Sequence, residues 1–150
     1  RLELYFEHHV KIKIYNKEGF KHANIVIPTY KDASREEVVS DLKASTFNSV
    51  NGNFVESPMD KKAVFNEERG RYTRLTKFTL PNVKEGSIIE FQYTIKSKRI
   101  AEMKDWYFQS DLPVNYSEFK TSVPEYFVYK SNQRGFLFPK VVFEKNPKTK

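Results

Sequence analysis

Three histidines are the residues whose types first suggest chemistry. The sequence contains His8, His9 and His22 and no cysteine, which excludes disulfides, thiolate metal sites and a cysteine nucleophile within these residues. Neighbouring histidines on a strand point to opposite faces of the sheet, whereas the ligands of one metal ion must converge. We therefore interpret all three as ordinary sheet histidines and predict no metal ion and no cofactor. A metalloenzyme that adds a distant carboxylate to these histidines is the less favoured alternative.

Other patterns that carry catalysis are missing from the sequence. We find no nucleophile elbow, Walker loop, dinucleotide fingerprint or zincin helix, and five glycines in 150 residues provide no phosphate-binding loop. The paired carboxylates Glu36-Glu37 and Glu67-Glu68 stand beside basic residues in polar stretches, which is typical of a solvated surface. We predict that this chain has no catalytic residue and is not an enzyme by itself.

The stretch from Asp105 to Gln109 concentrates aromatic residues. On a strand, Trp106 and Phe108 share one face, and Tyr107 and Gln109 share the other. Core packing is the favoured role of Trp106, because a single tryptophan in a sandwich usually packs between the sheets. The alternative is an aromatic platform for a sugar or a peptide. The tyrosines that we expect to form a surface patch are Tyr107, Tyr116, Tyr126 and Tyr129.

Glu90 is the carboxylate with the most apolar surroundings, since Ile88, Ile89 and Phe91 are its neighbours. Two interpretations are equally favoured. Glu90 is partly covered and paired with an arginine or with backbone amides, or it lies on the solvent face of a half-buried strand.

The net charge of +7 at pH 7 suggests a nucleic-acid surface. However, acidic residues lie close to most of the lysines and arginines, so a solvated basic surface is favoured and nucleic acid is not an expected partner. The densest basic stretch, residues 145–150, contains Lys145, Lys148 and Lys150, and we interpret it as a tail or linker. No apolar run has the roughly 20 residues that a membrane helix needs.

The elements that position these residues read mainly as strands. Residues 2–14 alternate between apolar and polar side chains, with His8 on the apolar face. The loop at 16–19 predicts a hairpin in which Tyr15 lies opposite Phe20. That register places Ile12 opposite Ala23, Val10 opposite Ile25 and His8 opposite Ile27, and Pro28 ends the hairpin.

Residues 34–47 fit two patterns. Ser34 to Glu37 resembles a helix capping box, while alternate residues from Val38 to Thr46 fit a strand. We favour a short helical turn, then a strand from about Leu42 to a turn at Asn51-Gly52.

Further strands are predicted at 72–80, 89–95, 105–112, 116–123, 126–130 and 136–144. The fold class expected from these runs is an antiparallel β-sandwich of roughly eight or more strands with little helix, in a single domain over residues 1–144.

Several spaced motifs in the second half of the chain resemble those of a known family. They are Lys77 to Val83, Gly86 to Phe91, Tyr93 to Ile95, Trp106 to Gln109, Pro113-Val114, Ser117-Glu118 and Pro124 to Tyr126. Together they resemble the β domain of unknown function found N-terminal to transglutaminase-like domains in bacterial proteins, notably of Bacteroidetes. The resemblance covers nearly all of the chain and includes the first hairpin.

The resemblance implies a longer parent protein that is periplasmic, secreted or attached to the cell envelope. Its catalytic Cys-His-Asp machinery would lie in a downstream domain, and this chain would begin slightly inside the family's N-terminal edge, without a first strand. The positions that match the family's pattern, with no established catalytic role, are Glu90, Trp106, Phe108, Gln109, Pro113 and Pro124.

We therefore expect a non-catalytic module that scaffolds the transglutaminase-like domain or positions its substrate. The alternative is a module that binds a carbohydrate or a peptide through exposed tyrosines. Nucleic-acid binding, which would weaken steeply with added salt, is less favoured.

Overall fold

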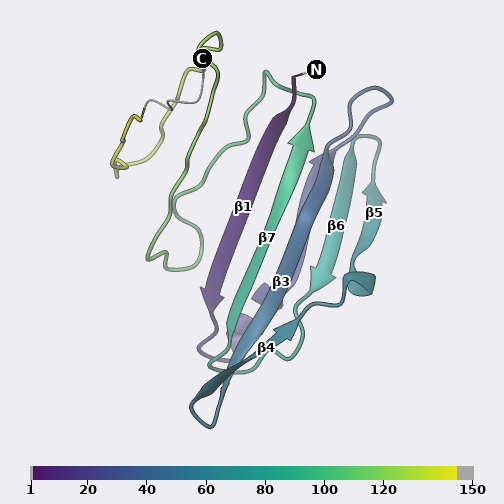
Figure 1. Cartoon of the computed structure of the whole chain (residues 1–150), viewed down its shortest axis with the longest axis vertical. Helices are drawn as coiled ribbons and strands as arrows, with labels where there is room; N and C mark the ends of the chain where they lie inside the picture. Colours follow the sequence, from purple (N-terminus) through teal and green to yellow (C-terminus); the bar gives the residue numbers. More distant parts are fainter. Residues whose placement is uncertain (1, 145–150) are drawn as a thin grey trace. The chain divides into compact units, whose positions relative to one another are not determined.

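Alternating apolar residues in the first hundred residues form seven antiparallel strands, as the computed structural model shows for residues 2–144 (Figure 1). Sheet A has the order β1-β7-β3-β4, and sheet B has the order β2-β6-β5. The strands are β1 (Leu4–Lys13), β2 (Asn24–Tyr30), β3 (Val38–Val50), β4 (Asn53–Pro58), β5 (Phe65–Arg69), β6 (Thr73–Thr79) and β7 (Ile88–Ser97). Two short 3-10 helices, η1 (Lys17–Ala23) and η2 (Lys61–Ala63), complete the elements. The predicted mostly-β sandwich class is confirmed.

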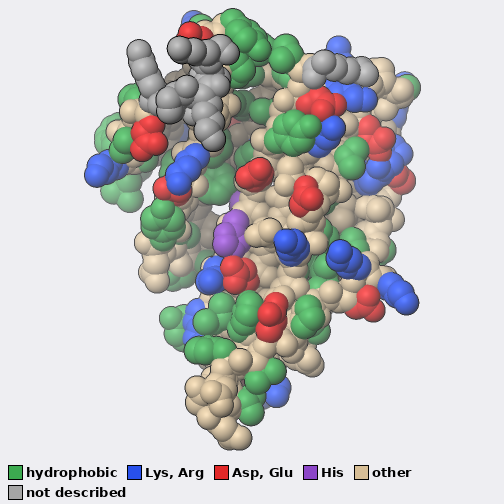
Figure 2. Space-filling view, in the orientation of Figure 1, with side chains coloured by type: hydrophobic (Ala, Val, Ile, Leu, Met, Phe, Trp, Pro, Cys, Tyr) green, Lys and Arg blue, Asp and Glu red, His purple; other side chains and the backbone are tan. Residues whose placement is uncertain are grey.

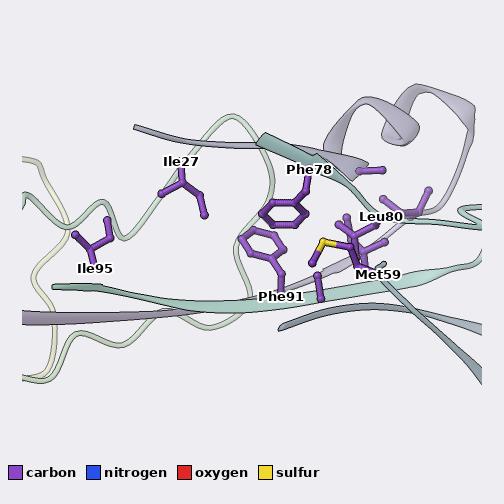
Figure 3. Packing of buried hydrophobic residues seen from close by; sticks show 10 residues of the cluster. Ile27, Met59, Phe78, Leu80, Phe91 and Ile95 are labelled. Atoms are coloured by element: carbon purple, nitrogen blue, oxygen red, sulfur yellow. The ribbon is translucent and has the colours of Figure 1, made fainter. Parts of the chain in front are cut away.

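The core lies between the two sheets. Ile27 and Phe78 point from sheet B toward Phe91 and Ile95 of sheet A (Figure 3). Phe78 and Phe91 meet edge to face, with ring centroids 6.2 Å apart at 76°. Each such side chain stabilises the fold by about 1.5–3 kcal/mol through burial. The predicted inward face of residues 89–95 is confirmed, because Ile89, Phe91 and Ile95 are buried.

The predicted first hairpin is wrong in its partners. β1 pairs along its whole length with β7, so that His8 lies opposite Tyr93, and β2 pairs with β6. Residues 17–23 form η1, which carries the chain from one sheet to the other. Gly19 belongs to this crossing, because a Cβ atom there would lie 3.1 Å from Ile14 Cγ2. Alternation identified the buried face of each strand but not its neighbour.

Pro28 does not end β2, which continues to Tyr30. β2 is an edge strand of sheet B, and an edge position tolerates proline because its missing N–H is not needed by a second neighbour.

β3 resolves the ambiguity at 34–47 in favour of the strand, which begins at Val38 rather than Leu42. Its pairing with β7 shifts between Ser40 and Lys43, and Asp41 has a φ of 53°. These are the signs of a β-bulge, which inserts one residue and bends the strand. The predicted Asn51-Gly52 turn is confirmed: both residues have positive φ between β3 and β4, as a two-residue hairpin turn requires.

The strands predicted at 105–112, 116–123, 126–130 and 136–144 are wrong, because residues 105–144 form no strand or helix. The chain divides into two units, Arg1–Lys104 and Asp105–Lys150, and all seven strands belong to the first. Aromatic residues alternate with polar residues in parts of this second unit, but the backbone of residues 105–144 does not pair into a sheet. The predicted tail at 145–150 lies outside the described residues, and the boundary of a single domain at 144 stays a prediction. Among the residues described, no helix is long and apolar enough to span a membrane.

Thr46 provides a stability test of the core. It is fully buried, and its Oγ1 has no hydrogen-bond partner among residues 2–144. Because an unsatisfied buried hydroxyl costs about 1–3 kcal/mol, we expect Thr46→Val to raise the free energy of unfolding in urea by about 1 kcal/mol.

Thr76→Val is the matched control, because Thr76 is also buried but donates a 2.8 Å hydrogen bond to Asn66 Oδ1. That variant should lose about 1 kcal/mol. Equal losses in the two variants would contradict the assignment of Thr46 as unsatisfied.

Candidate functional site

A cleft of about 530 Å³ opens between the two sheets of the first unit, beside the first half of β3. Its floor contains the partly buried Val39, Leu42 and Val64 and the buried Met59, which all contact the core. Polar groups converge on it from three strands: Glu37 precedes β3, Asn66 lies on β5, and Arg74 and Thr76 lie on β6. A concave site with an apolar floor and a few placed polar groups is the usual form of a ligand-binding site.

Glu37 is the most buried carboxylate of this region, with 7% of its side chain exposed. Its Oε2 accepts hydrogen bonds of 2.9 Å from the Tyr30 backbone N–H and from Lys104 Nζ. Burial alone would raise the pKa of Glu37, but these hydrogen bonds and the Lys104 charge outweigh burial, so the pKa lies below its usual value. Glu37 is therefore an ionised, fixed anchor that ties β2 to the start of β3.

A second, smaller hollow of about 370 Å³ shares Glu37 and Thr29 with the cleft. Two of its lining side chains, Tyr30 and Tyr72, stack with parallel rings 5.9 Å apart. The Arg99 guanidinium lies 4.1 Å from the centre of the Tyr30 ring, a cation–π contact that stabilises by about 0.5–2 kcal/mol. Arg99 also pairs with Glu102. The side chains that line this hollow therefore interact with one another: Tyr30 with Tyr72 and Arg99, and Arg99 with Glu102.

Arg74 belongs to an ion-pair network on the rim of the cleft. It pairs with Glu36 and, at 2.9 Å, with Glu68, which also accepts from Lys31 at 2.6 Å. The two pairings hold the pKa of Glu68 below its usual value. The predicted solvated role of these paired carboxylates is too simple, because Glu36 and Glu68 fix the arginine while Glu37 is buried.

Glu90 lies on the outer face of sheet A, away from the cleft. Its Oε1 accepts from His9 Nε2 at 2.7 Å, and its Oε2 lies 3.3 Å from Lys11 Nζ. Burial alone would raise the pKa of Glu90, but these partners hold it below its usual value. Both interpretations were partly right, because the carboxylate is partly covered yet on the solvent face. Its partners are neither arginine nor backbone amides. In Figure 2, histidine, acidic and basic side chains lie close together on the visible face, with hydrophobic side chains around them.

His8 lies on the inner face of β1, where its Nδ1 is 2.7 Å from Tyr93 Oη. Burial lowers the pKa of His8 and raises the pKa of Tyr93 to about 12, so both are neutral near pH 7. The predicted satisfied histidine agrees with this geometry. His22 lies in η1, so the prediction that it is a sheet histidine is wrong. Residues 2–144 hold no group of three or more histidine or acidic side chains that could bind a metal ion.

The other family-pattern residues belong to the second unit. Trp106 is half-buried, stacks on Phe119 with centroids 5.5 Å apart and meets Phe108 edge to face at 6.4 Å. Its Nε1 donates to Ser117 Oγ at 3.2 Å. Trp106 packs against aromatic rings as favoured, but these rings belong to residues 105–144, which form no strand. Pro124 is half-buried, whereas Gln109 and Pro113 are exposed. Their functional roles stay predictions.

The four predicted surface tyrosines differ in exposure. Tyr107 and Tyr116 are each 78% exposed, Tyr126 is 71% exposed, and Tyr129 is half-buried. Tyr116 Oη donates to Glu118 at 2.9 Å, which raises its pKa.

Sequence reasoning missed the cleft and the anchoring role of Glu37. The one signal was the ambiguity at 34–47, where a capping-box pattern is followed directly by a strand pattern.

Residues 3–148 match the family described as a "Domain of Unknown Function with solved-structure structure (DUF3857)". A search of curated proteins found no match. A search of solved structures also found none.

Glu37→Gln tests the anchor. The variant leaves Lys104 without its carboxylate, so we expect the free energy of unfolding at pH 7 to fall by about 1–3 kcal/mol. Because the pKa of Glu37 is lower in the folded state than its ordinary 4.5, its stabilisation is present above that value and lost as the pH falls through the folded pKa. The difference between the variant and the parent in urea unfolding should therefore shrink below about pH 4.5.

Glu36→Gln is the matched control, because Glu36 is 42% exposed and Arg74 keeps Glu68. We expect a change within about 0.5 kcal/mol. A difference between Glu37→Gln and the parent that stays constant down to pH 3 would contradict the ionised anchor.

Proposed function

Because this chain belongs to the DUF3857 family, we propose that it is a non-catalytic module of a larger protein, which docks onto a transglutaminase-like domain downstream in the same chain. Docking holds that domain in place or positions its substrate. The motifs from Lys77 to Tyr126 support this proposal through their resemblance to domains in that arrangement. The same resemblance supports an exported or envelope-associated parent.

The observation that carries the docking proposal is an apolar segment at residues 136–143, with the sequence FLFPKVVF. Its large side chains are uncovered: Phe136 is fully exposed, Phe143 is 93% exposed, and Leu137, Phe138, Val141 and Val142 are each at least 64% exposed. Contiguous exposed apolar side chains mark interaction sites. In the proteins that this chain resembles, the transglutaminase-like domain follows this domain. The apolar segment would then be close in sequence to the transglutaminase-like domain. Arg134 and Lys140, which are also exposed in and beside this segment, are compatible with docking, because surfaces between domains of one chain are moderately polar.

Thermal unfolding tests docking. We expect a longer protein that includes the transglutaminase-like domain to unfold in one shared transition, with this module melting at a higher temperature than the isolated chain. Phe136→Asp combined with Phe143→Asp should split that transition in two. Both side chains are exposed, so the same changes should leave the melting temperature of the isolated chain unaltered.

Val128→Asp is the matched control, since Val128 is 89% exposed but lies outside the apolar segment. It should leave the shared transition intact. Independent melting of the two domains in the longer protein, at the temperature of the isolated chain, would refute docking.

The exposed tyrosines support a second candidate function, the binding of a carbohydrate or a peptide. Tyr107, Tyr116 and Tyr126 present aromatic faces to solvent, and aromatic contacts contribute about 0.5–1.5 kcal/mol beyond the area that they bury. If this function holds, soluble cell-wall oligosaccharides should change the tyrosine and tryptophan fluorescence. Tyr107→Ala should weaken that binding about tenfold. Tyr15→Ala, at 80% exposure in the first unit, is the control. An equal effect of the two substitutions would argue against the tyrosine patch.

A further inference from the structure

The first half of β3 has a neighbouring strand, β7, on one side only. β4 pairs with β3 only from Ser45 to Val50, and the Met59 N–H then bonds to the Ala44 carbonyl at 2.8 Å. Before Ala44, the residues of β3 pair with β7 on one side, and no strand within residues 2–144 pairs on the other. The segment Val38–Lys43 therefore presents an unpaired backbone edge about 20 Å long.

The cleft lies along this free edge. After Met59 the chain leaves sheet A through η2 and enters β5 of sheet B, so residues of that connection form the opposite wall of the cleft. The buried Met59 and the partly buried Val39, Leu42 and Val64 form its floor. The vacant position thus combines backbone hydrogen-bonding groups with an apolar surface that faces the sandwich interior.

From this arrangement we propose that the cleft binds an extended peptide, which adds to sheet A as a strand beside Val38–Lys43. Backbone bonding to the edge supplies affinity, and alternate side chains of the peptide enter the cleft, as in other cases of strand addition. The cleft is lined by residues of the first unit only and shares no residue with the apolar segment at 136–143, so the variants that test this proposal differ from those that test docking.

The charges of the cleft select the peptide. Glu37 is neutralised by Lys104, and Arg74 by Glu36 and Glu68. Lys43, Lys61 and Asp41 line the cleft and are exposed, and none of the three forms an ion pair with any other residue of the described part. Asp41 accepts a 2.9 Å hydrogen bond from Ser40 Oγ, and the two lysines leave the cleft with an excess of positive charge. A peptide with an acidic residue next to its apolar side chains complements these two lysines.

The cleft beside the edge favours a single extended peptide over a second copy of the chain. Residues of η2, β5 and β6 line the cleft together with Val38–Lys43, so a single extended peptide can pair with the edge and fill the cleft at the same time. The bulge at Asp41 bends the strand at the same place. Bulges protect edges from indiscriminate pairing, which restricts the site to a partner that also fills the cleft.

The test begins with a random dodecapeptide library displayed on phage and selected against the intact chain. We expect enriched peptides with alternating apolar residues and at least one Asp or Glu. A synthetic copy of such a peptide should slow hydrogen exchange of the Val38–Lys43 amides, measured by NMR. The same peptide with alternate backbone amides N-methylated should lose binding, because it cannot form the ladder.

Charge reversal of the two cleft lysines then tests whether they contribute to peptide binding. Lys43→Glu combined with Lys61→Glu should weaken peptide binding about tenfold or more. Lys17→Glu combined with Lys21→Glu changes the net charge equally on the exposed surface of η1 and should leave binding unaltered. All four lysines are exposed, so neither pair endangers folding.

Four outcomes would overturn the proposal: no enrichment from the library, protection of amides elsewhere, equal binding of the N-methylated peptide, or equal loss in both lysine pairs. Concentration-dependent dimerisation that protects Val38–Lys43 would assign the edge to a second copy instead, and would also overturn it.

Discussion

The position of β7 at the centre of sheet A is the constraint on which the rest of the structure depends. Ten consecutive residues, Ile88–Ser97, pair with β1 on one side, and most of them also pair with β3 on the other, where the register shifts at the bulge. Its inner side chains include Ile89, Phe91 and Ile95, all buried against sheet B. Because its side chains alternate strictly, a shift of one residue would turn this apolar face to solvent. β7 thus sets the register of both neighbours and the spacing of the two sheets.

The sequence patterns predicted the buried face of a strand more successfully than they predicted which strands pair. The alternation from Leu4 to Lys13 is correct residue by residue, and the turn at Asn51-Gly52 follows from the backbone demands of a short hairpin. The partner of β1 could not be predicted, because β2 and β7 offer equally suitable apolar faces. Local proximity favoured β2, but residues 17–23 form η1 and carry the chain to the other sheet instead of turning it back beside β1.

The candidate site depends on properties that no local pattern contains. The cleft exists because β4 stops pairing with β3 at Ser45 and because the chain then changes sheets. Glu37 looked like a solvated carboxylate in a charged stretch, and only the approach of Tyr30 and Lys104 makes it a buried anchor. In the same way, the aromatic alternation after Asp105 resembled strands, yet residues 105–144 form no strand, and Trp106 stacks there on Phe119.

The pairing of β1 with β7 also determines the order in which the protein can assemble. Leu4 lies opposite Ser97, so β1 has no partner on this side of its sheet until β7, the last strand of the first unit, has been made. Sheet B closes earlier, because β2, β5 and β6 all precede β7. Pairings this distant in sequence carry a large loop-closure cost and form slowly. During synthesis, β1 therefore waits as an apolar strand without its sheet partner, and sheet A closes only when β7 pairs with β1.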